Sequence, residues 1–262
     1  MATRGLNNVI PMTNIAPKNK DWQTATLIEA KPIANNVISL RFSISPWAVS
    51  TAGQHYDIRL TAPNGYQAER SYSLGNPPEE EGVLEFGVQL LNDGEVSPYL
   101  FKLKAGDKVE VRGPIGGHFI WNYKMPGPLV LIGGGSGMVP LMAMLRHWVK
   151  HQKEDQERTI IFLISARTLE HVLYKDELDA ISRDYTNVKI VLTITDSVPP
   201  NWTGYKRRID MEMIKEVLGG LVAHMPMIYV CGPTPFVEAV AKNLILTGFN
   251  SHEVRTERFG GA

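Results

Sequence analysis

The residues with the clearest chemical potential form a glycine-rich loop, Gly133 to Gly137, which is interrupted only by Ser136. The loop follows the apolar run "PLVLIG" and precedes apolar residues at helical spacing, so it connects a buried strand to a helix. At such a junction the backbone N–H groups and the helix dipole form a site for phosphate. A tight turn without a ligand remains the alternative, because a glycine cluster alone is a weak signal.

The loop departs from the usual dinucleotide-binding fingerprint. Pro140 stands where the third glycine of that fingerprint is expected, and the next apolar run ends in Ser165, Ala166 and Arg167 rather than in an acidic residue for the ribose hydroxyls. Proline is compatible with the first turn of a helix, whose N–H groups have no intrahelical partner. The sequence therefore predicts a phosphate loop that differs from that of ordinary dehydrogenases.

Two hydrophobic patterns surround this loop. From Trp22 to Trp121, apolar and polar residues mostly alternate, as in "VISLRFSI", and turn signals separate the runs. Short alternating strands at near-regular spacing indicate an antiparallel barrel. After "YKMPGPLV", continuous apolar runs alternate with helical patterns, which indicates a parallel sheet covered on both faces.

We therefore expect two domains. Residues 1–20 are polar, without periodicity, and are predicted to form a flexible N-terminal tail, or alternatively a strap over the surface. Residues 21–125 are predicted to form the antiparallel β-barrel, and residues 126–262 the α/β domain with its parallel sheet.

Composition excludes several classes of partner and cofactor. Among 262 residues, Lys plus Arg and Asp plus Glu number 27 each, so no net charge draws the chain to nucleic acid. A single cysteine excludes an internal disulfide and an iron–sulfur cluster held by this chain alone, and hence a fused ferredoxin domain. No apolar run is long enough for a membrane span, and the first residues lack a signal-peptide pattern, so we expect a cytoplasmic location.

Four segments, taken in order, resemble the ferredoxin–NADP reductase superfamily of flavoproteins, including its NADH–cytochrome b5 reductase and dioxygenase-reductase branches. They are "RSYSL" at residues 70–74, "GGSGMVP" at 134–140, "CGPTPFVEAV" from residue 231 and "ERFG" at 257–260. The resemblance covers about residues 22 to 260. It implies an FAD-binding barrel and an NAD(P)-binding α/β domain.

The resemblance also implies how FAD is held. Arg70 can form bidentate bonds to a pyrophosphate, Tyr72 can lie along the flavin, and Ser73 can reach the ring nitrogen that accepts a hydride. The "DGEVSPYL" segment resembles the family's second phosphate contact, although Ser97 could simply cap a helix and a solvated strand face could explain Arg70. The residues assigned to FAD are Arg70, Ser71, Tyr72, Ser73, Gly94, Val96, Ser97 and Phe259.

On the nicotinamide side, the resemblance places Cys231 beside the reacting ring, and Phe259 over the flavin face that nicotinamide must reach. We expect no covalent catalysis, because hydride transfer needs aligned rings and no nucleophile. A core cysteine and an ordinary last strand are the alternatives. The hydride-transfer residues are then Ser73, Cys231 and Glu257, and those assigned to NAD(P) are Gly134, Gly135, Ser136, Gly137, Pro140, Ser165, Arg167, Asp196, Cys231, Gly232 and Pro233.

The choice of pyridine nucleotide depends on opposing charges. Asp196, after "TIT", resembles the acidic residue of NADH-using cytochrome b5 reductases, and an acidic group suits a free ribose diol. Arg167 and the "YKRR" run at 205–208 would instead suit a 2′-phosphate. The sequence favours NADH over NADPH, and FAD over FMN only through the resemblance.

His147 and His151 have the i, i+4 spacing of a metal-binding pair. No third ligand is evident in the sequence, so we expect a solvated helix end and no metal site, and an exposed turn at Glu79 to Glu81.

Together these features predict an FAD-dependent NAD(P)H oxidoreductase that passes electrons to a separate redox protein, such as a ferredoxin, a haem protein or an oxygenase component. The alternatives are a flavoenzyme that reduces a small molecule directly and a non-catalytic nucleotide-binding regulatory subunit.

Overall fold

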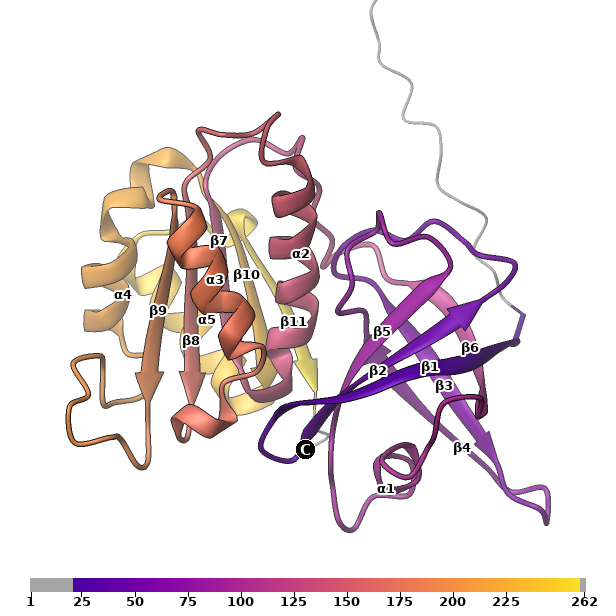
Figure 1. The fold of residues 1–262 in the computed structure, drawn as a ribbon. Coiled ribbons are helices and arrows are strands. Elements are labelled where there is room, and N and C mark those ends of the chain that lie inside the picture. Colours follow the sequence, from indigo (N-terminus) through magenta and orange to yellow (C-terminus); the bar gives the residue numbers. More distant parts are fainter. Residues whose placement is uncertain (1–20, 260–262) are drawn as a thin grey trace, which may run out of the picture.

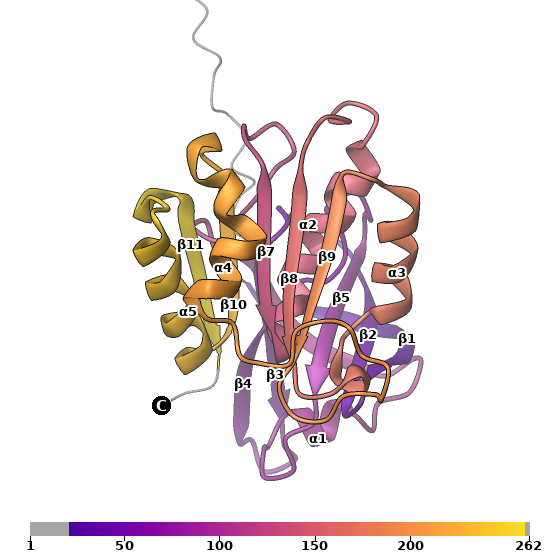
Figure 2. The same cartoon turned by 90° about the vertical axis from the view of Figure 1, so that its left-hand side faces the viewer.

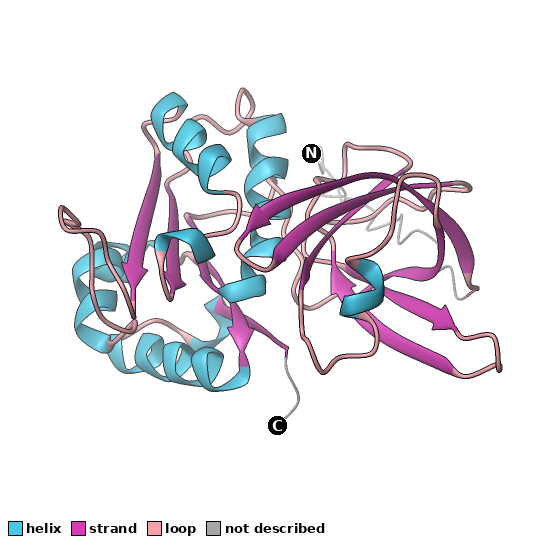
Figure 3. Cartoon of the chain, turned by 60° about the horizontal axis from the view of Figure 1, so that its bottom comes forward, coloured by secondary structure: helices cyan, strands magenta, loops and turns pink. Residues whose placement is uncertain are grey.

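The computed structural model describes residues 21–259. The chain forms two sheets that lie side by side, one made of the first six strands and one made of the last five (Figure 1). Figure 3 shows that the helices gather around the second sheet, whereas the first carries a single short helix. The predicted tail, residues 1–20, lies outside the described residues.

The first sheet is an antiparallel barrel. Its strands follow the order β4-β3-β6-β1-β2-β5, and a bridge between Leu74 and Phe86 joins the two edge strands. The alternation seen in the sequence buries one face of the strands, where Leu40, Phe42 and Phe86 are fully enclosed. The strands are β1 Gln23–Ala34, β2 Val37–Ile44, β3 His55–Thr61, β4 Gln67–Ser73, β5 Val83–Gln89 and β6 Lys108–Ile115, and the helix α1 is Ser97–Leu100.

The second sheet is parallel, with the order β11-β10-β7-β8-β9. Alternate residues of β7 enter different cores: Leu129 and Leu131 pack with α2 and α3, whereas Val130 and Ile132 pack with α4 and α5 (Figure 2). Coverage of both faces explains the continuous apolar runs. The strands are β7 Leu129–Gly134, β8 Ile160–Ala166, β9 Val188–Ile194, β10 Met227–Pro233 and β11 Val254–Phe259. The helices are α2 Met138–His151, α3 Lys175–Asp184, α4 Met211–Leu218 and α5 Thr234–Thr247, with 3-10 turns at Gly135–Gly137, Leu169–His171, Gly219–His224 and Ser251–Glu253.

The expected fold class, an antiparallel barrel followed by a parallel α/β sheet, is therefore confirmed. In the second sheet the chain runs outward from β7 through β8 to β9 and then resumes at β10 on the other side of β7. Ligands of open α/β sheets bind outside the carboxyl ends of the strands at such a switch point. Within residues 21–259, no helix is long and apolar enough to span a membrane.

Helix α2 forms much of the contact between the two domains. Its Val139 lies against Gly87 of β5, so that a Cβ atom at Gly87 would come within 2.4 Å of it. The Arg146 side chain reaches the barrel as well, donating to the carbonyl of Gly75 at 2.8 Å and to Glu85 at 3.0 Å. The helix that follows the glycine-rich loop is thus fixed directly to the barrel.

Candidate active site at the domain junction

Three residues from distant segments converge where the domains meet. Ser73 ends β4 in the barrel, while Cys231 and Glu257 are register partners in the parallel pair β10–β11. The Ser73 hydroxyl donates to Oε2 of Glu257 at 3.5 Å, and the Cys231 thiol donates to the same oxygen at 3.9 Å. Two of the predicted hydride-transfer residues, Ser73 and Cys231, thus donate to the carboxylate of the third, Glu257.

His55, which the motifs did not reveal, completes this group. It pairs with Ser73 across the β3–β4 ladder, and its Nδ1 lies 4.0 Å from Oε1 of Glu257. Burial lowers the pKa of His55, although the negative charge of Asp57 opposes this shift. The imidazole is therefore neutral near neutral pH.

Burial also governs protonation of the carboxylate and the thiol. It raises the pKa of Glu257 to about 7, against the opposing hydrogen bonds from Ser73 and Cys231. Burial and the nearby Glu257 raise the pKa of the Cys231 thiol well above its ordinary value. Glu257 can therefore gain or lose a proton near neutral pH, whereas Cys231 stays a thiol and is no nucleophile.

Strand β4 sorts the "RSYS" residues onto two faces. Arg70 and Tyr72 share one face because side chains alternate along a strand. The Tyr72 ring packs on Phe86 with centroids 6.3 Å apart, and burial raises its pKa to about 12. Ser71 points the other way and donates to Asp57 at 2.6 Å, so its hydroxyl does not join Arg70 and Tyr72.

The Arg70 guanidinium lies beside the turn that begins at Gly94. Its Nη2 is 3.8 Å from Oε2 of Glu95, and its side chain is 57% exposed, so it remains accessible to an anion. Tyr72 makes no side-chain hydrogen bond within the described part of the chain. A cation, an aromatic face and a nearby turn fit the needs of a flavin nucleotide with its pyrophosphate.

Ser97 does not cap α1, contrary to the capping alternative. It is already the first helical residue, Val96 occupies the N-cap position, and no side-chain capping bond is present. The Ser97 hydroxyl instead accepts from the backbone N–H of Leu91 at 3.0 Å. Its role is to close the Leu91–Ser97 loop next to Arg70, while Val96 is buried beneath it.

The glycine-rich loop lies at the carboxyl ends of β7 and β10. A Cβ atom at Gly137 would come within 2.2 Å of the Cys231 carbonyl oxygen, so only glycine permits this approach. Gly135 has φ +57° and nothing within 4 Å of its Cβ position, which leaves space above the loop for a ligand. Ser136 belongs to the same 3-10 turn, and Pro140 lies in the first turn of α2.

Phe236, in the first turn of α5, was not identified from the sequence. Its ring covers two glycines at the strand ends, since Cβ atoms at Gly134 and Gly232 would lie 3.2 Å and 2.6 Å from it. Pro233 ends β10 opposite Phe259 of β11, and Phe259 packs against the core that contains Cys231. The "CGP" and "ERF" segments are therefore adjacent strand ends.

The residues expected to select the coenzyme lie together at the ends of β8 and β9. The backbone N–H of Asp196 donates to the carbonyl of Arg167 at 3.0 Å, and both side chains are exposed. Ser165 lies half-buried on β8, beside Gly134 of β7 in the ladder. In the "YKRR" run, Arg207 is occupied by Asp210 at 2.8 Å and by Glu216 at 3.5 Å, so it is less available to a phosphate.

The histidine pair on α2 differs from the expected solvated helix end. His147 is only 4% exposed, because it packs against Trp121 and Tyr123 at the domain contact. Glu79 supplies the third group that the sequence did not reveal, since its position depends on how the barrel docks onto α2.

Two family models match the chain in order. The model of the oxidoreductase FAD-binding domain matches residues 24–121, and that of the oxidoreductase NAD-binding domain matches residues 131–242. The first range spans the six barrel strands, and the second extends from β7 into α5. Ser73 therefore lies within the FAD-binding match and Cys231 within the NAD-binding match, whereas Glu257 lies beyond both matched ranges.

Sequence relatives and solved structures agree with this division. One component of the Na(+)-translocating NADH-quinone reductase is 33% identical in Pseudomonas aeruginosa and 30% identical in Psychrobacter arcticus, in each case over 73% of this chain and 49% of the relative. The chain thus spans about half the length of the curated relatives it matches. A cytochrome P450 reductase from Amycolatopsis is 26% identical, with a TM-score of 0.78 over 91% of this chain and 70% of that one. The cytochrome b5 reductase domain of Ulva prolifera nitrate reductase is also 26% identical, with a TM-score of 0.75 over 92% and 98% of the two chains.

Proposed function

Since the chain belongs to the ferredoxin–NADP reductase superfamily of FAD- and NAD-binding oxidoreductases, we propose that it oxidises NAD(P)H and passes the electrons to a separate redox protein. The observation that carries this proposal is the convergence of Ser73 from the barrel with Cys231 and Glu257 from the nucleotide domain. FAD, when bound, supplies the chemistry, because it accepts two electrons as a hydride and releases them singly. The chain's own residues would bind and orient the two nucleotides and would hold or transfer protons.

On the flavin side, Arg70 and the turn from Gly94 to Ser97 would bind the pyrophosphate, and the Tyr72 ring would lie along the flavin. Arg70 offers a planar guanidinium with several N–H donors, which suits a phosphate oxygen pair. Ser73 follows directly on the same strand at the domain junction. Its hydroxyl can turn from Glu257 toward a flavin ring nitrogen.

On the nucleotide side, Gly134 to Gly137 would bind the pyrophosphate of NAD(P)H through backbone N–H groups at the start of α2. Cys231 and Gly232 would flank the nicotinamide, and Phe259 must tilt to admit it. Glu257 lies beside Ser73 and Cys231 and can hold a proton near neutral pH. This arrangement supplies alignment rather than a nucleophile.

A separate protein acceptor is favoured by the kind of proteins that the chain resembles. A cytochrome P450 reductase, by its name, reduces a separate cytochrome. The only cysteine, Cys231, lies in the site itself, so this chain has no ligand set for an iron–sulfur cluster. The cytoplasmic location expected from the sequence stays a prediction, which cell fractionation would test.

We also propose NADH as the preferred coenzyme, because exposed Asp196 would repel a 2′-phosphate and can accept from ribose hydroxyls. Replacing Asp196 with Ser should shift the ratio of kcat/KM for NADH over NADPH toward NADPH by about tenfold, which corresponds to about 1.4 kcal/mol. Steady-state rates with an artificial electron acceptor measure this ratio. Asp184→Ser, at the opposite end of the sheet, is the matched control, and an unchanged ratio in Asp196→Ser would refute the assignment.

A further inference from the structure

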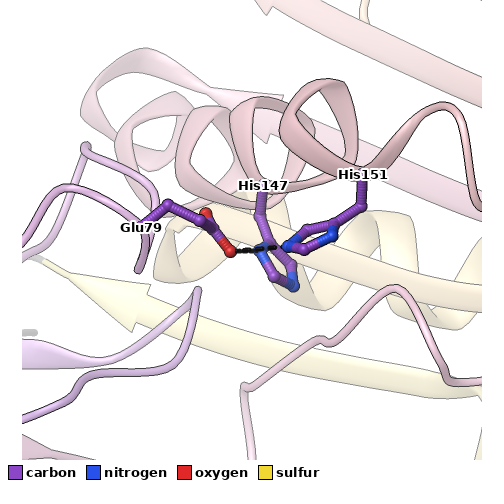
Figure 4. Close-up of side chains that lie close together, drawn as sticks. All are labelled: Glu79, His147 and His151. Atoms are coloured by element: carbon purple, nitrogen blue, oxygen red, sulfur yellow. Dashed lines mark hydrogen bonds and ion pairs between the residues drawn. The ribbon is translucent and has the colours of Figure 1, made fainter.

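A cluster of three side chains outside the candidate active site joins the two domains. His147 and His151 project from one face of α2, and Glu79 comes from the loop between β4 and β5 of the barrel. Figure 4 shows the Glu79 carboxylate pointing to both imidazoles. Its Oε1 lies 2.7 Å from Nδ1 of His147 and 2.9 Å from Nε2 of His151.

We propose that Glu79, His147 and His151 bind a zinc ion that links the barrel to α2. Two imidazole nitrogens and a carboxylate oxygen are ligands that Zn²⁺ prefers, and a solvent molecule can complete a four-coordinate site. All three ligand atoms lie within 4.8 Å of one another. The three side chains can therefore coordinate one zinc ion without a change of fold.

The distances require only a small expansion to admit the ion. With metal–ligand bonds of about 2.0 to 2.2 Å, ligand atoms around a tetrahedral zinc lie about 3.3 Å apart. The present contacts of 2.7 Å and 2.9 Å must therefore lengthen by a few tenths of an ångström. Glu79 can provide this movement, because its side chain is 29% exposed and belongs to a loop.

Neighbouring aromatic rings hold both imidazoles in place. The Tyr123 ring stacks on His151 with centroids 3.9 Å apart and planes 6° apart. Trp121 contacts His147 edge-on at 5.7 Å. Ligands whose orientation is fixed by packing lose little conformational freedom on binding a metal, which favours affinity.

The polar environment of His147 also favours an added ligand. Its Nδ1 contacts Glu79, while its buried Nε2, which the proposed site does not use, has no hydrogen-bond partner within residues 21–259. A single carboxylate oxygen now serves both rings, whereas a cation would bring each ring its own strong bond.

Because its ligands come from both domains, the ion would fix the β4–β5 loop to the helix that starts at the nucleotide loop. This role differs from hydride transfer and does not depend on it. The same residues without metal would form only a hydrogen-bonded link, and the experiment separates these two cases.

The test is a zinc titration of the full chain after treatment with a chelator, in competition with a chromophoric zinc indicator. We expect about one Zn²⁺ per chain, and binding weakened at least about tenfold in both His151→Gln and Glu79→Gln. His224→Gln, an exposed histidine elsewhere in the α/β domain, should bind as the unaltered chain does. Buried His147 is left intact, and circular dichroism verifies that the variants fold.

A second measurement identifies the ligands directly. X-ray absorption of the zinc-loaded chain should show nitrogen and oxygen neighbours at about 2.0 to 2.2 Å with scattering from two imidazoles, and one imidazole fewer in His151→Gln. Binding no tighter in the unaltered chain than in these variants would overturn the site. Unchanged affinity in Glu79→Gln would overturn the link between the domains, because both remaining ligands belong to α2.

Discussion

The carboxylate of Glu257 is the centre of the domain junction at the scale of single residues. Oε2 accepts from Ser73 and Cys231, and Oε1 faces the neutral ring of His55. Each neighbour comes from a different strand: β3, β4 or β10. The surroundings of the carboxylate, which itself belongs to β11, therefore depend on how these four strands are arranged. Burial keeps its pKa near 7, which makes it the residue best suited to hold a proton during turnover.

Replacing Glu257 with Gln should flatten the dependence of stability on pH. The pKa of this carboxyl rises from 4.5 to about 7 on folding, so between these values the folded chain keeps a proton that the unfolded chain has lost. The free energy of unfolding therefore falls as pH rises through this window, by up to about 3 kcal/mol from this group. Denaturant unfolding at about pH 5 and about pH 7.5 measures this fall in the free energy of unfolding. The Glu257→Gln substitution should largely remove the contribution of this group.

Glu238→Gln is the matched control, because Glu238 is an exposed carboxylate on α5. The free energy of unfolding of Glu238→Gln should depend on pH in the same way as that of the unaltered chain. If Glu257→Gln does so as well, the carboxyl does not titrate as its burial indicates.

The sequence identified Ser73, Cys231 and Glu257 because each lies in a short motif with its own residue pattern. It did not identify His55, whose place depends on the register of the β3–β4 hairpin. A one-residue slip in that register would turn His55 to the other face, and no local pattern fixes it.

At the scale of secondary-structure elements, the site is built where β7 and β10 end side by side. The loop after β7 passes so close to β10 that no side chain fits at Gly137. Its backbone angles, φ −62° and ψ −11°, are helical and suit any residue. Glycine is therefore required here because the Cys231 carbonyl leaves no room for a side chain, and not because of the backbone angles.

Gly137→Ala should displace the loop from β10 and weaken NADH binding. The added Cβ would overlap the Cys231 carbonyl, and such overpacking costs about 1 to 3 kcal/mol, which predicts a KM for NADH raised by about fivefold or more. Gly220→Ala is the control, because nothing lies within 4 Å of its Cβ position. Steady-state kinetics measures the KM for NADH of both variants. Equal KM values in Gly137→Ala and Gly220→Ala would contradict close packing of the loop.

Alternation and continuous apolar runs made the barrel and the parallel sheet predictable, since both follow from which strand faces are buried. The role of Ser97 was not predictable, because its hydroxyl serves a loop contact to Leu91 instead of a helix end. The Ser97 hydroxyl could bond either the backbone of Leu91 or an N–H group at the helix end. The path of the whole loop decides which of these partners it reaches.

At the scale of the whole molecule, a charged cluster around Arg146 fixes the two domains to each other. Arg146 bonds Glu177 of its own domain at 2.6 and 2.7 Å and reaches Glu85 of the barrel at 3.0 Å. Tyr174 donates to Glu85 at 3.1 Å, and Arg41 lies 3.4 Å from it. The Glu85 side chain is only 4% exposed, so these partners, rather than water, surround its carboxylate.

Arg146→Met should lower the free energy of unfolding by about 3 to 5 kcal/mol, because it leaves the buried charge of Glu85 undercompensated. The double variant Arg146→Met/Glu85→Gln should be more stable than the single one, since the buried charge is gone. Denaturant unfolding measures both. A double variant less stable than the single variant would show that the charge at Glu85 is not what Arg146 compensates.

The docking of the domains was the part least accessible from the sequence. Arg146, Glu85 and Tyr174 carry no shared motif, and they meet only after both cores have formed. The same holds for Glu79 and the two histidines of α2, which meet only where the barrel docks onto that helix and where His147 is buried against Trp121 and Tyr123. Interfaces between domains depend on shapes that only the folded units possess.

The central claim is that hydride passes from NAD(P)H to FAD at the junction of Ser73, Cys231 and Glu257. It is tested most directly by mixing the purified protein with NADH without oxygen and following the absorption of the oxidised flavin. We predict stoichiometric bleaching, slower when NADH carries deuterium at the transferred position, and slowed at least about tenfold in Glu257→Gln with flavin content unchanged. A protein that binds no flavin, or whose flavin neither NADH nor NADPH bleaches, would contradict the account.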